Sequence, residues 1–481
     1  MEKFAYFLEN INPEHSEVNR ELLLESIKTG KWRERLQVLS DYKLPTNVGP
    51  IGTAFKYMQK FDPESIRILK ENSTGENKVF QIIERPYAHI LPNWFPRIYS
   101  EENEKWRETA KKYLGNYENS KWHLLPEFDV SPQVIYALKE QGSEGTFVHQ
   151  DIFKNVPNTP FLVNGSLGSK IIGLPCKAGV KDEIHKFLNG NSGERELNNV
   201  IQNEYEQVGN NGVLGIWLDW ETPDFSVAGN ESFEYLVKTF KQSGLNFELV
   251  DKNKTRELKE HLKKNPKRVE IEEPSRRVSI SIPERNYQKW LFSGRNQRLK
   301  ADTDNLISLY EKLKRTKKKD LEKVMPIIQE CVLYAPVSDS YSSGLYGVSE
   351  KAISKEVNAD VLAKRKGITG KPEEVFSEEL KKGIAKVKDG KLYVEIKSDP
   401  HRYLESVDLS IIAQNLGTGM LNDDEEKILR SHKMLEDVKS GLIERGMPSN
   451  YEIIMARLEE PLKPFETLVK KYKKELHKLA S

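Results

Sequence analysis

The chain has 481 residues, and its 75 Lys and Arg residues nearly balance its 73 Asp and Glu residues. A formal net charge of +2 creates no strong field that would attract nucleic acid or an anionic membrane, which excludes a nonspecific polyanion binder. The length allows one large domain with an appended one, or three small domains, and is ample for a sizeable core.

The cysteine content and the apolar runs indicate the cellular setting. Cys176 and Cys331 are too few for a disulfide framework or a zinc knuckle. The chain begins MEKFAYFLEN, without the basic and apolar segments of an export signal, and no stretch approaches the roughly 18 apolar residues of a spanning helix. We therefore expect a cytoplasmic protein whose partners include neither nucleic acid nor a membrane.

Short apolar runs bounded by turns alternate with helical patterns over the first half of the chain. The runs are KVFQII (78–83), VIYALKEQG (134–142), TFVHQ (146–150), SKIIGLP (169–175) and VLGIWLDW (213–220), and the helical patterns cover 61–72, 104–115 and 231–244. This alternation predicts an α/β sheet or barrel.

The second half changes character after about residue 255. Segments 303–334 and 423–446 place Leu, Ile and Val at three- and four-residue spacings, which predicts helices. GIAKVKDGKLYVEIK (383–397) is an exception, because period-2 alternation flanks Asp389-Gly390, the signal of a type I′ hairpin.

The stretch GVLGIWLDWETPDF (212–225) ends an apolar run on two carboxylates, Asp219 and Glu221. Strand alternation puts both on the face of Trp217, with Trp220 opposite. Residues at the carboxyl end of a strand face the ligand crevice in α/β folds. The pair could cap a helix or form a salt bridge, bind metal in a nuclease, or serve a glycosidase that has a partner carboxylate about 5 Å away.

A partner carboxylate is present in KWHLLPEFDVSPQVIYALKEQG (121–142). Glu127 follows a short apolar run and precedes a helix-period segment. Pro126 biases Leu125 toward extended geometry, so we expect Glu127 to leave a strand end as well.

The order of segments resembles glycoside hydrolase family 57, with α-amylase-like members. The resemblance covers about residues 30–336 and is carried by 47–71 (NVGPIGTAFKYMQKFDPESIRILKE), 81–97 (QIIERPYAHILPNWFPR), 124–150 (LLPEFDVSPQVIYALKEQGSEGTFVHQ), 215–222 (GIWLDWET), 279–313 and 325–336. It implies an incomplete (β/α)7 barrel followed by a C-terminal helical region, and retaining hydrolysis or transfer of α-glucosidic bonds in α-glucans or related oligosaccharides.

The resemblance also implies the site. Glu127 would be the nucleophile, Asp219 the general acid/base, and Glu221 would help to raise the pKa of Asp219 by like-charge repulsion. The implied substrate-binding residues are Tyr87, His89, His149, Trp217 and Trp290. The chemistry needs no metal and no organic cofactor.

Departures from the family pattern keep two alternatives open. The first strand ends Asn10-Ile11-Asn12-Pro13 where the family has His-Gln-Pro, and Pro223-Asp224-Phe225 follows Asp219-Trp220-Glu221-Thr222 where the family usually has a histidine. A catalytically weakened carbohydrate-binding or scaffold relative would explain these changes. A metal-dependent nuclease using Asp219 and Glu221 is the minor alternative.

The expected domains are a barrel-type catalytic domain over 1–270, a helical segment packed on the barrel over 271–336, and a mostly helical region over 337–481 with a hairpin near 384–397. A homo-oligomer stays open, because helices outside the resemblance could form its interface.

Overall fold

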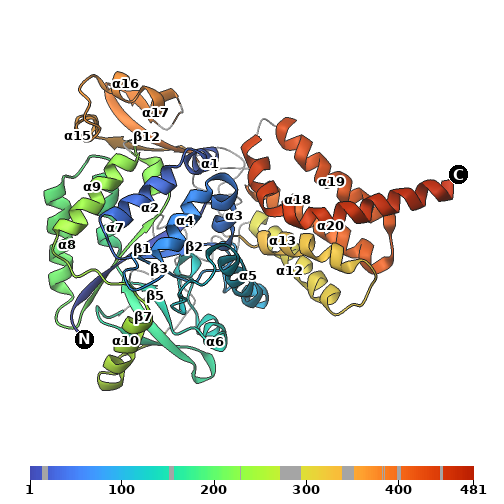
Figure 1. Ribbon diagram of the computed structural model, residues 1–481, viewed down its shortest axis with the longest axis horizontal. Helices are drawn as coiled ribbons and strands as arrows, with labels where there is room; N and C mark the ends of the chain where they lie inside the picture. The colour runs from blue at the N-terminus through green and yellow to red at the C-terminus, as the bar shows by residue number, and fades with distance from the viewer. Residues whose placement is uncertain are drawn as a thin grey trace.

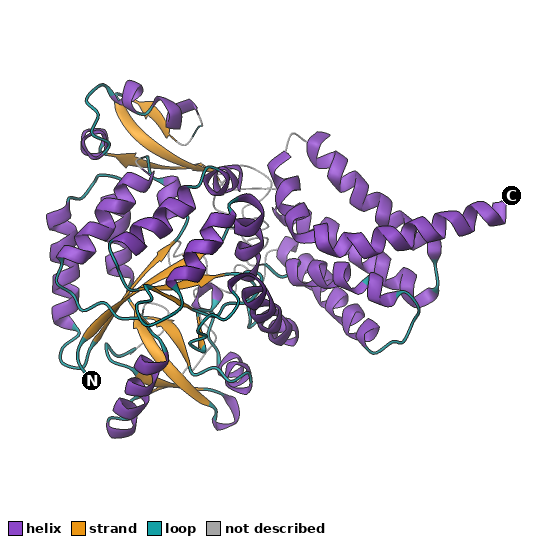
Figure 2. Cartoon of the chain, in the orientation of Figure 1, coloured by secondary structure: helices purple, strands orange, loops and turns teal. Residues whose placement is uncertain are grey.

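The computed structural model describes residues 1–13, 20–150, 156–227, 229–270, 294–337, 352–381, 383, 385–397, 402–444 and 448–480. The fold is α/β, with parallel strands surrounded by helices and a C-terminal helical region (Figures 1 and 2). Within these ranges no helix is both long and apolar enough to cross a membrane.

Seven parallel strands form the wall of the N-terminal part: β1 (Phe4–Ile11), β2 (Thr46–Pro50), β3 (Phe80–Ile82), β4 (Trp122–His123), β5 (Gly145–His149), β7 (Lys170–Cys176) and β8 (Val213–Asp219). One sheet has the order β3-β2-β1-β8 and the other β4-β5-β7-β6-β9. In the second sheet, β6 (Phe161–Asn164) runs antiparallel to β7, and β9 (Arg268–Val269) pairs with β6.

The two sheets meet at both edges. The amide of Glu84, beyond β3, donates to the carbonyl of Trp122 in β4 at 2.9 Å. At the other edge, the amide of Lys177 donates to the carbonyl of Gly215 in β8 at 3.2 Å. A Cβ at Gly215 would lie 2.3 Å from the Pro175 carbonyl oxygen, so glycine permits this close approach. The parallel strands therefore curve into a barrel.

Strand alternation separates two cores. Along β1, Phe4, Tyr6 and Leu8 belong to the cluster inside the barrel, whereas Ala5 and Phe7 belong to the cluster between the strands and the helices. The surrounding helices are α1 (Arg20–Lys28), α2 (Lys31–Asp41), α3 (Gly52–Phe61), α4 (Pro63–Asn72), α5 (Pro96–Leu114), α6 (Pro132–Glu140), α7 (Ala178–Leu188), α8 (Glu194–Gln207), α9 (Gly229–Gln242) and α10 (Lys252–Lys264).

The stretch 134–142, given above among the apolar runs and also as the helix-period segment after Glu127, lies in helix α6 as far as Glu140. Ser131 caps it by accepting a hydrogen bond from the Val134 amide, and Pro132 occupies the first turn. These signals favour a helix start and outweigh the apolar run.

The C-terminal helices form a bundle beside α3 and α5, drawn in yellow and red (Figure 1). Its members are α12 (Gly294–Lys314), α13 (Met325–Tyr334), α18 (Arg402–Asn422), α19 (Glu425–Glu444) and α20 (Pro448–Ala480). The predicted helical segment 303–334 is thus divided between α12 and α13, and Asp320, with φ 62°, lies in the connection.

A small three-stranded unit lies apart from the bundle, over the barrel (Figure 1). Strands β10 (Ala352–Val357), β12 (Lys391–Lys397) and β11 (Ala385–Lys388) form an antiparallel sheet with α15 (Ala359–Arg365), α16 (Pro372–Val375) and α17 (Ser377–Lys381). Asp389 and Gly390, with φ 51° and 73°, form the hairpin turn. The described residues after 337 therefore contribute to two units, the three-stranded unit and the helical bundle.

Candidate active site

Asp219 is the last residue of β8, at the carboxyl end of the barrel strands. Trp217, two residues earlier, belongs to the interior cluster, whereas Leu218 and Trp220 belong to the helix-facing cluster. The expected alternation of Trp217 and Trp220 is thus present, and it directs Asp219 to the interior face, where its side chain is 19% exposed.

Two donors hold the Asp219 carboxylate. The side-chain amide of Asn10, at the matching register of β1, donates to Oδ1 at 2.8 Å. The ammonium of Lys181 in α7 donates to Oδ2 at 2.7 Å. The carboxylate is therefore positioned by β1 on one side and by helix α7 on the other, and the contact with a cation favours its ionised form.

An aromatic cluster adjoins this carboxylate. The ring of Trp217 meets Phe128 at 5.2 Å and His149 at 5.8 Å between centroids, both edge to face. The Lys181 ammonium lies 3.2 Å from the centroid of Trp217, as a cation–π contact. Burial and then Lys181 lower the pKa of His149 to about 3, so this imidazole is neutral at ordinary pH.

Glu127 lies in a short turn, Pro126–Phe128, just after β4. Leu125 is extended, with φ −77° and ψ 136°, as Pro126 predicts. Glu127 and Phe128 both have left-handed backbones, with φ 52° and 51°. This conformation costs a non-glycine residue about 1–3 kcal/mol and is enriched at functional sites.

The fold brings the turn of Glu127 next to the end of β8. Phe128 follows Glu127 directly, and its ring packs on Trp217, two residues before Asp219. The two carboxylates singled out in the sequence therefore belong to neighbouring segments at one end of the barrel.

Two further carboxylates are buried behind Asp219. Glu221 is 1% exposed and Glu9, in β1, is fully buried. Burial and then Asp219 raise the pKa of Glu221 well above its ordinary value. Burial also raises that of Glu9, although Arg35 opposes this. Repulsion from Asp219 thus raises the pKa of Glu221. The predicted effect in the other direction, of Glu221 on the pKa of Asp219, requires Glu221 to be ionised.

Sequence analysis did not single out Asn10, Glu9 or Lys181 as site residues. Register on β1 places Asn10 opposite Asp219, and alternation turns Glu9 to the helix side. Lys181 reaches the site from a helix whose charged pattern resembles any solvated surface. Only the arrangement of the strands reveals these three residues.

The remaining predicted site residues occupy different surroundings. His89 is buried, at 3% exposed. Tyr87 is also buried, and its hydroxyl donates to the Glu330 carboxylate of α13 at 2.9 Å, so it is directed toward the helical bundle. Trp290 lies outside the described residues.

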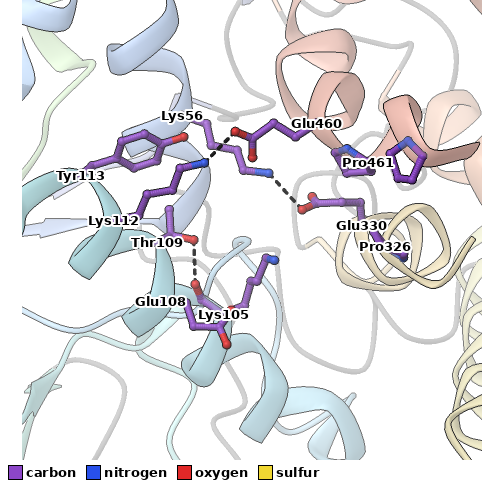
Figure 3. Close-up of a pocket in the computed structure, with 11 residues that line it drawn as sticks. Lys56, Lys105, Glu108, Thr109, Lys112, Tyr113, Pro326, Glu330, Glu460 and Pro461 are labelled. Atoms are coloured by element: carbon purple, nitrogen blue, oxygen red, sulfur yellow. Dashed lines mark hydrogen bonds and ion pairs between the residues drawn. The ribbon is translucent and has the colours of Figure 1, made fainter. Parts of the chain in front are cut away.

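Glu330 is the centre of a network where the bundle meets the barrel. Besides Tyr87, it accepts a hydrogen bond from the Lys56 ammonium at 3.0 Å, and Arg457 Nε lies 3.7 Å away. Figure 3 shows Lys56 of α3 pointing at Glu330 in a pocket of about 270 Å³. The lining of this pocket contains none of the predicted site residues.

A metal ion would need several ligating side chains close together in the part of the chain that the structure describes. There, no cluster of three or more His, Cys, Asp or Glu side chains is arranged to bind one. The nuclease alternative requires such a cluster.

Comparison with known families gives a match over part of the barrel, and the match ends before β8. Residues 9–172 match the family model described as glycosyl hydrolase family 57. No curated protein has a sequence that matches the chain.

Solved structures show a similar fold at low sequence identity. A branching enzyme from Thermococcus kodakaraensis is 12% identical with a TM-score of 0.56, over 89% of this chain and 94% of that one. An exo-type maltose-forming amylase from Pyrococcus sp. ST04 is 10% identical with a TM-score of 0.50, over 94% and 82%. For a 4-alpha-glucanotransferase from Thermococcus litoralis the values are 13% and 0.49, over 75% of this chain and 62% of that one.

Proposed function

We propose that this chain, which belongs to glycosyl hydrolase family 57 through residues 9–172, is a retaining glycoside hydrolase or transglycosidase acting on α-glucans or related oligosaccharides. The observation that carries the proposal is the meeting of two carboxylate-bearing strand ends. Glu127 and Asp219 flank the contact between Phe128 and Trp217 at the carboxyl end of the barrel.

In the proposed reaction Glu127 attacks the anomeric carbon while Asp219 gives its proton to the departing glycosidic oxygen. A covalent glycosyl-enzyme forms and the leaving sugar departs as an alcohol. Asp219 then removes a proton from water, or from the hydroxyl of a second sugar, which attacks the anomeric carbon and frees Glu127. Water as acceptor gives hydrolysis, and a sugar gives transfer.

The surrounding groups support this chemistry in different ways. Asn10 and Lys181 orient Asp219. Trp217 and neutral His149 adjoin Asp219 and remain predicted contacts to the sugar, with Lys181 over the face of Trp217. His89 remains a predicted contact to the sugar, whereas the predicted role of Tyr87 conflicts with its hydrogen bond to Glu330.

The test is the release of sugar from maltooligosaccharides and starch, with products separated by chromatography. Glu127→Gln and Asp219→Asn should each lower the rate by at least about 100-fold, because each removes a group that acts on the reacting bond. Glu140→Gln and Asp182→Asn make the same substitutions at exposed positions and should leave the rate unchanged. Equal rates for all five proteins would contradict the assignment.

A glycan-binding relative with little turnover is the second candidate. It is favoured by Lys181, which contacts both Asp219 and the face of Trp217. This candidate predicts binding of maltooligosaccharides without product, and product that depends on Glu127 and Asp219 would remove it.

A further inference from the structure

Lys181 enters the site from the first turns of α7, the helix that follows β7. Its side chain is only 12% exposed. The ammonium lies 2.7 Å from Oδ2 of Asp219 and 3.2 Å from the centroid of Trp217. One ammonium group thus contacts the proposed acid/base and also covers the aromatic ring on which the sugar is proposed to bind.

The position over Trp217 is incompatible with a stacked sugar on that face. A nitrogen 3.2 Å from the ring centroid is in van der Waals contact with the ring, so no sugar atom fits between them. Phe128 and His149 already approach the ring edge to face. A sugar that stacks on the face covered by the ammonium must therefore take its place.

Charged and titratable groups approach Asp219 from several elements. Glu9 of β1 and Glu221 after β8 interact electrostatically with Asp219, and Lys181 of α7 contacts it. His149 of β5 interacts with Lys181, Arg35 of α2 with Glu9, and Asp224 with Glu221. Burial raises the pKa of Glu9 and of Glu221, and the pKa of His149 is lowered to about 3, so all three favour neutral forms. Arg35 forms an ion pair with Asp224. Lys181 contacts the Asp219 carboxylate directly.

We propose that Lys181 is a positioning residue that keeps Asp219 ionised in the unliganded site and covers Trp217 until a sugar ring displaces it. This inference rests on the proposed function, in which Asp219 must carry a proton before it acts as an acid. Once the ammonium has moved, Asp219 takes up a proton from solvent and gives it to the glycosidic oxygen. Asp219 therefore becomes able to act as an acid only after a sugar ring has bound at Trp217.

The titration of Asp219 itself tests the inference. Carboxyl-labelled [13C]Asp protein is titrated by NMR, with the Asp219 signal identified as the one missing from Asp219→Asn. Lys181→Met should move the Asp219 midpoint upward by about 1–3 pH units, because an ammonium in contact favours the carboxylate by that amount. Lys181→Arg keeps the charge and should titrate near the wild type. Lys186→Met, on the same helix but paired with Glu183, is the control.

A sugar should act on the wild type as the loss of Lys181 does. Thio-linked maltotetraose, which resists hydrolysis, should move the wild-type Asp219 midpoint upward and leave Lys181→Met nearly unchanged. In turnover, the alkaline limb of the kcat/KM profile, which reports groups of the free enzyme, should shift to higher pH in Lys181→Met, whereas the limb of kcat should stay near that of the wild type.

Two results would overturn the inference even if the protein turns over maltooligosaccharides. One is an Asp219 midpoint that is unchanged in Lys181→Met. The other is a wild-type Asp219 midpoint that does not move when the sugar binds. Failure of the proposed function has a different signature. In that case no variant releases sugar, and the comparison of wild type with Lys181→Met still decides whether Lys181 controls Asp219.

Discussion

Two clusters of buried carboxylates in this protein differ in how their charge is balanced. At the junction between barrel and bundle, burial acts to raise the pKa of Glu330, but Lys56 and Arg457 overcome it, and the pKa is lowered. At the strand ends, burial raises the pKa of Glu9 and Glu221. At the junction, cations thus favour the ionised form of the buried Glu330, whereas at the strand ends burial favours the protonated forms of Glu9 and Glu221.

The difference indicates where function lies. Carboxyls with strongly shifted pKa values are enriched at catalytic sites, and burial without full charge compensation costs stability. A carboxylate surrounded by cations and a hydroxyl mainly holds elements together. Variants in the two clusters should therefore change stability in opposite directions.

Glu330→Ala should have the largest effect. It leaves Lys56 and Arg457 without their common carboxylate partner in a buried site, and such a loss costs about 3–5 kcal/mol. Urea unfolding followed by tryptophan fluorescence measures the change. A loss below about 1 kcal/mol would show that the network contributes little, and that the contrast between the clusters is incorrect.

Glu9→Gln should have the opposite sign, with a dependence on pH. Neither carboxylate oxygen of Glu9 has a hydrogen-bond partner among the described residues. Because its folded pKa is raised, the unfolded chain loses this proton above about pH 4.5 while the folded chain keeps it, so wild-type stability falls as pH rises. Glutamine removes this loss.

The advantage of Glu9→Gln should grow from pH 4.5 upward, by at most about 1.4 kcal/mol per pH unit, until the folded protein also releases the proton. Thermal unfolding of both proteins across this range measures it. Glu2→Gln removes an exposed carboxylate and should show no such trend. A constant difference at all pH values would mean that Glu9 is ionised in the folded protein.

Lys60→Met should have the smallest effect on stability, because it removes an exposed ion pair and not a buried one. Lys60 pairs with Glu459 of α20 at 2.9 Å, near the Lys56–Glu330 pair, but both side chains are exposed. Solvent screens such a pair, so the loss should stay below about 1 kcal/mol and shrink in high salt. A loss as large as that of Glu330→Ala would show that burial does not set the difference.

Local pattern was sufficient for several features. Alternation placed Trp217 and Asp219 on one face of β8, because side chains of a strand alternate whatever the strand pairs with. Pro126 fixed the extended backbone of Leu125 by steric contact between neighbours. The Asp389-Gly390 turn forms from two residues that accept positive φ. None of these depends on a distant part of the chain.

Tertiary structure decided what surrounds Asp219 and Glu330. Asn10 and Asp219 are 209 positions apart, and Lys56 and Glu330 are 274 apart, so barrel closure and bundle docking create these contacts. The sequence by itself determined which carboxylates stand at strand ends and which face they occupy. Only the fold decided which of them meet a cation and which are buried without one, because that depends on distances between elements that no local pattern records.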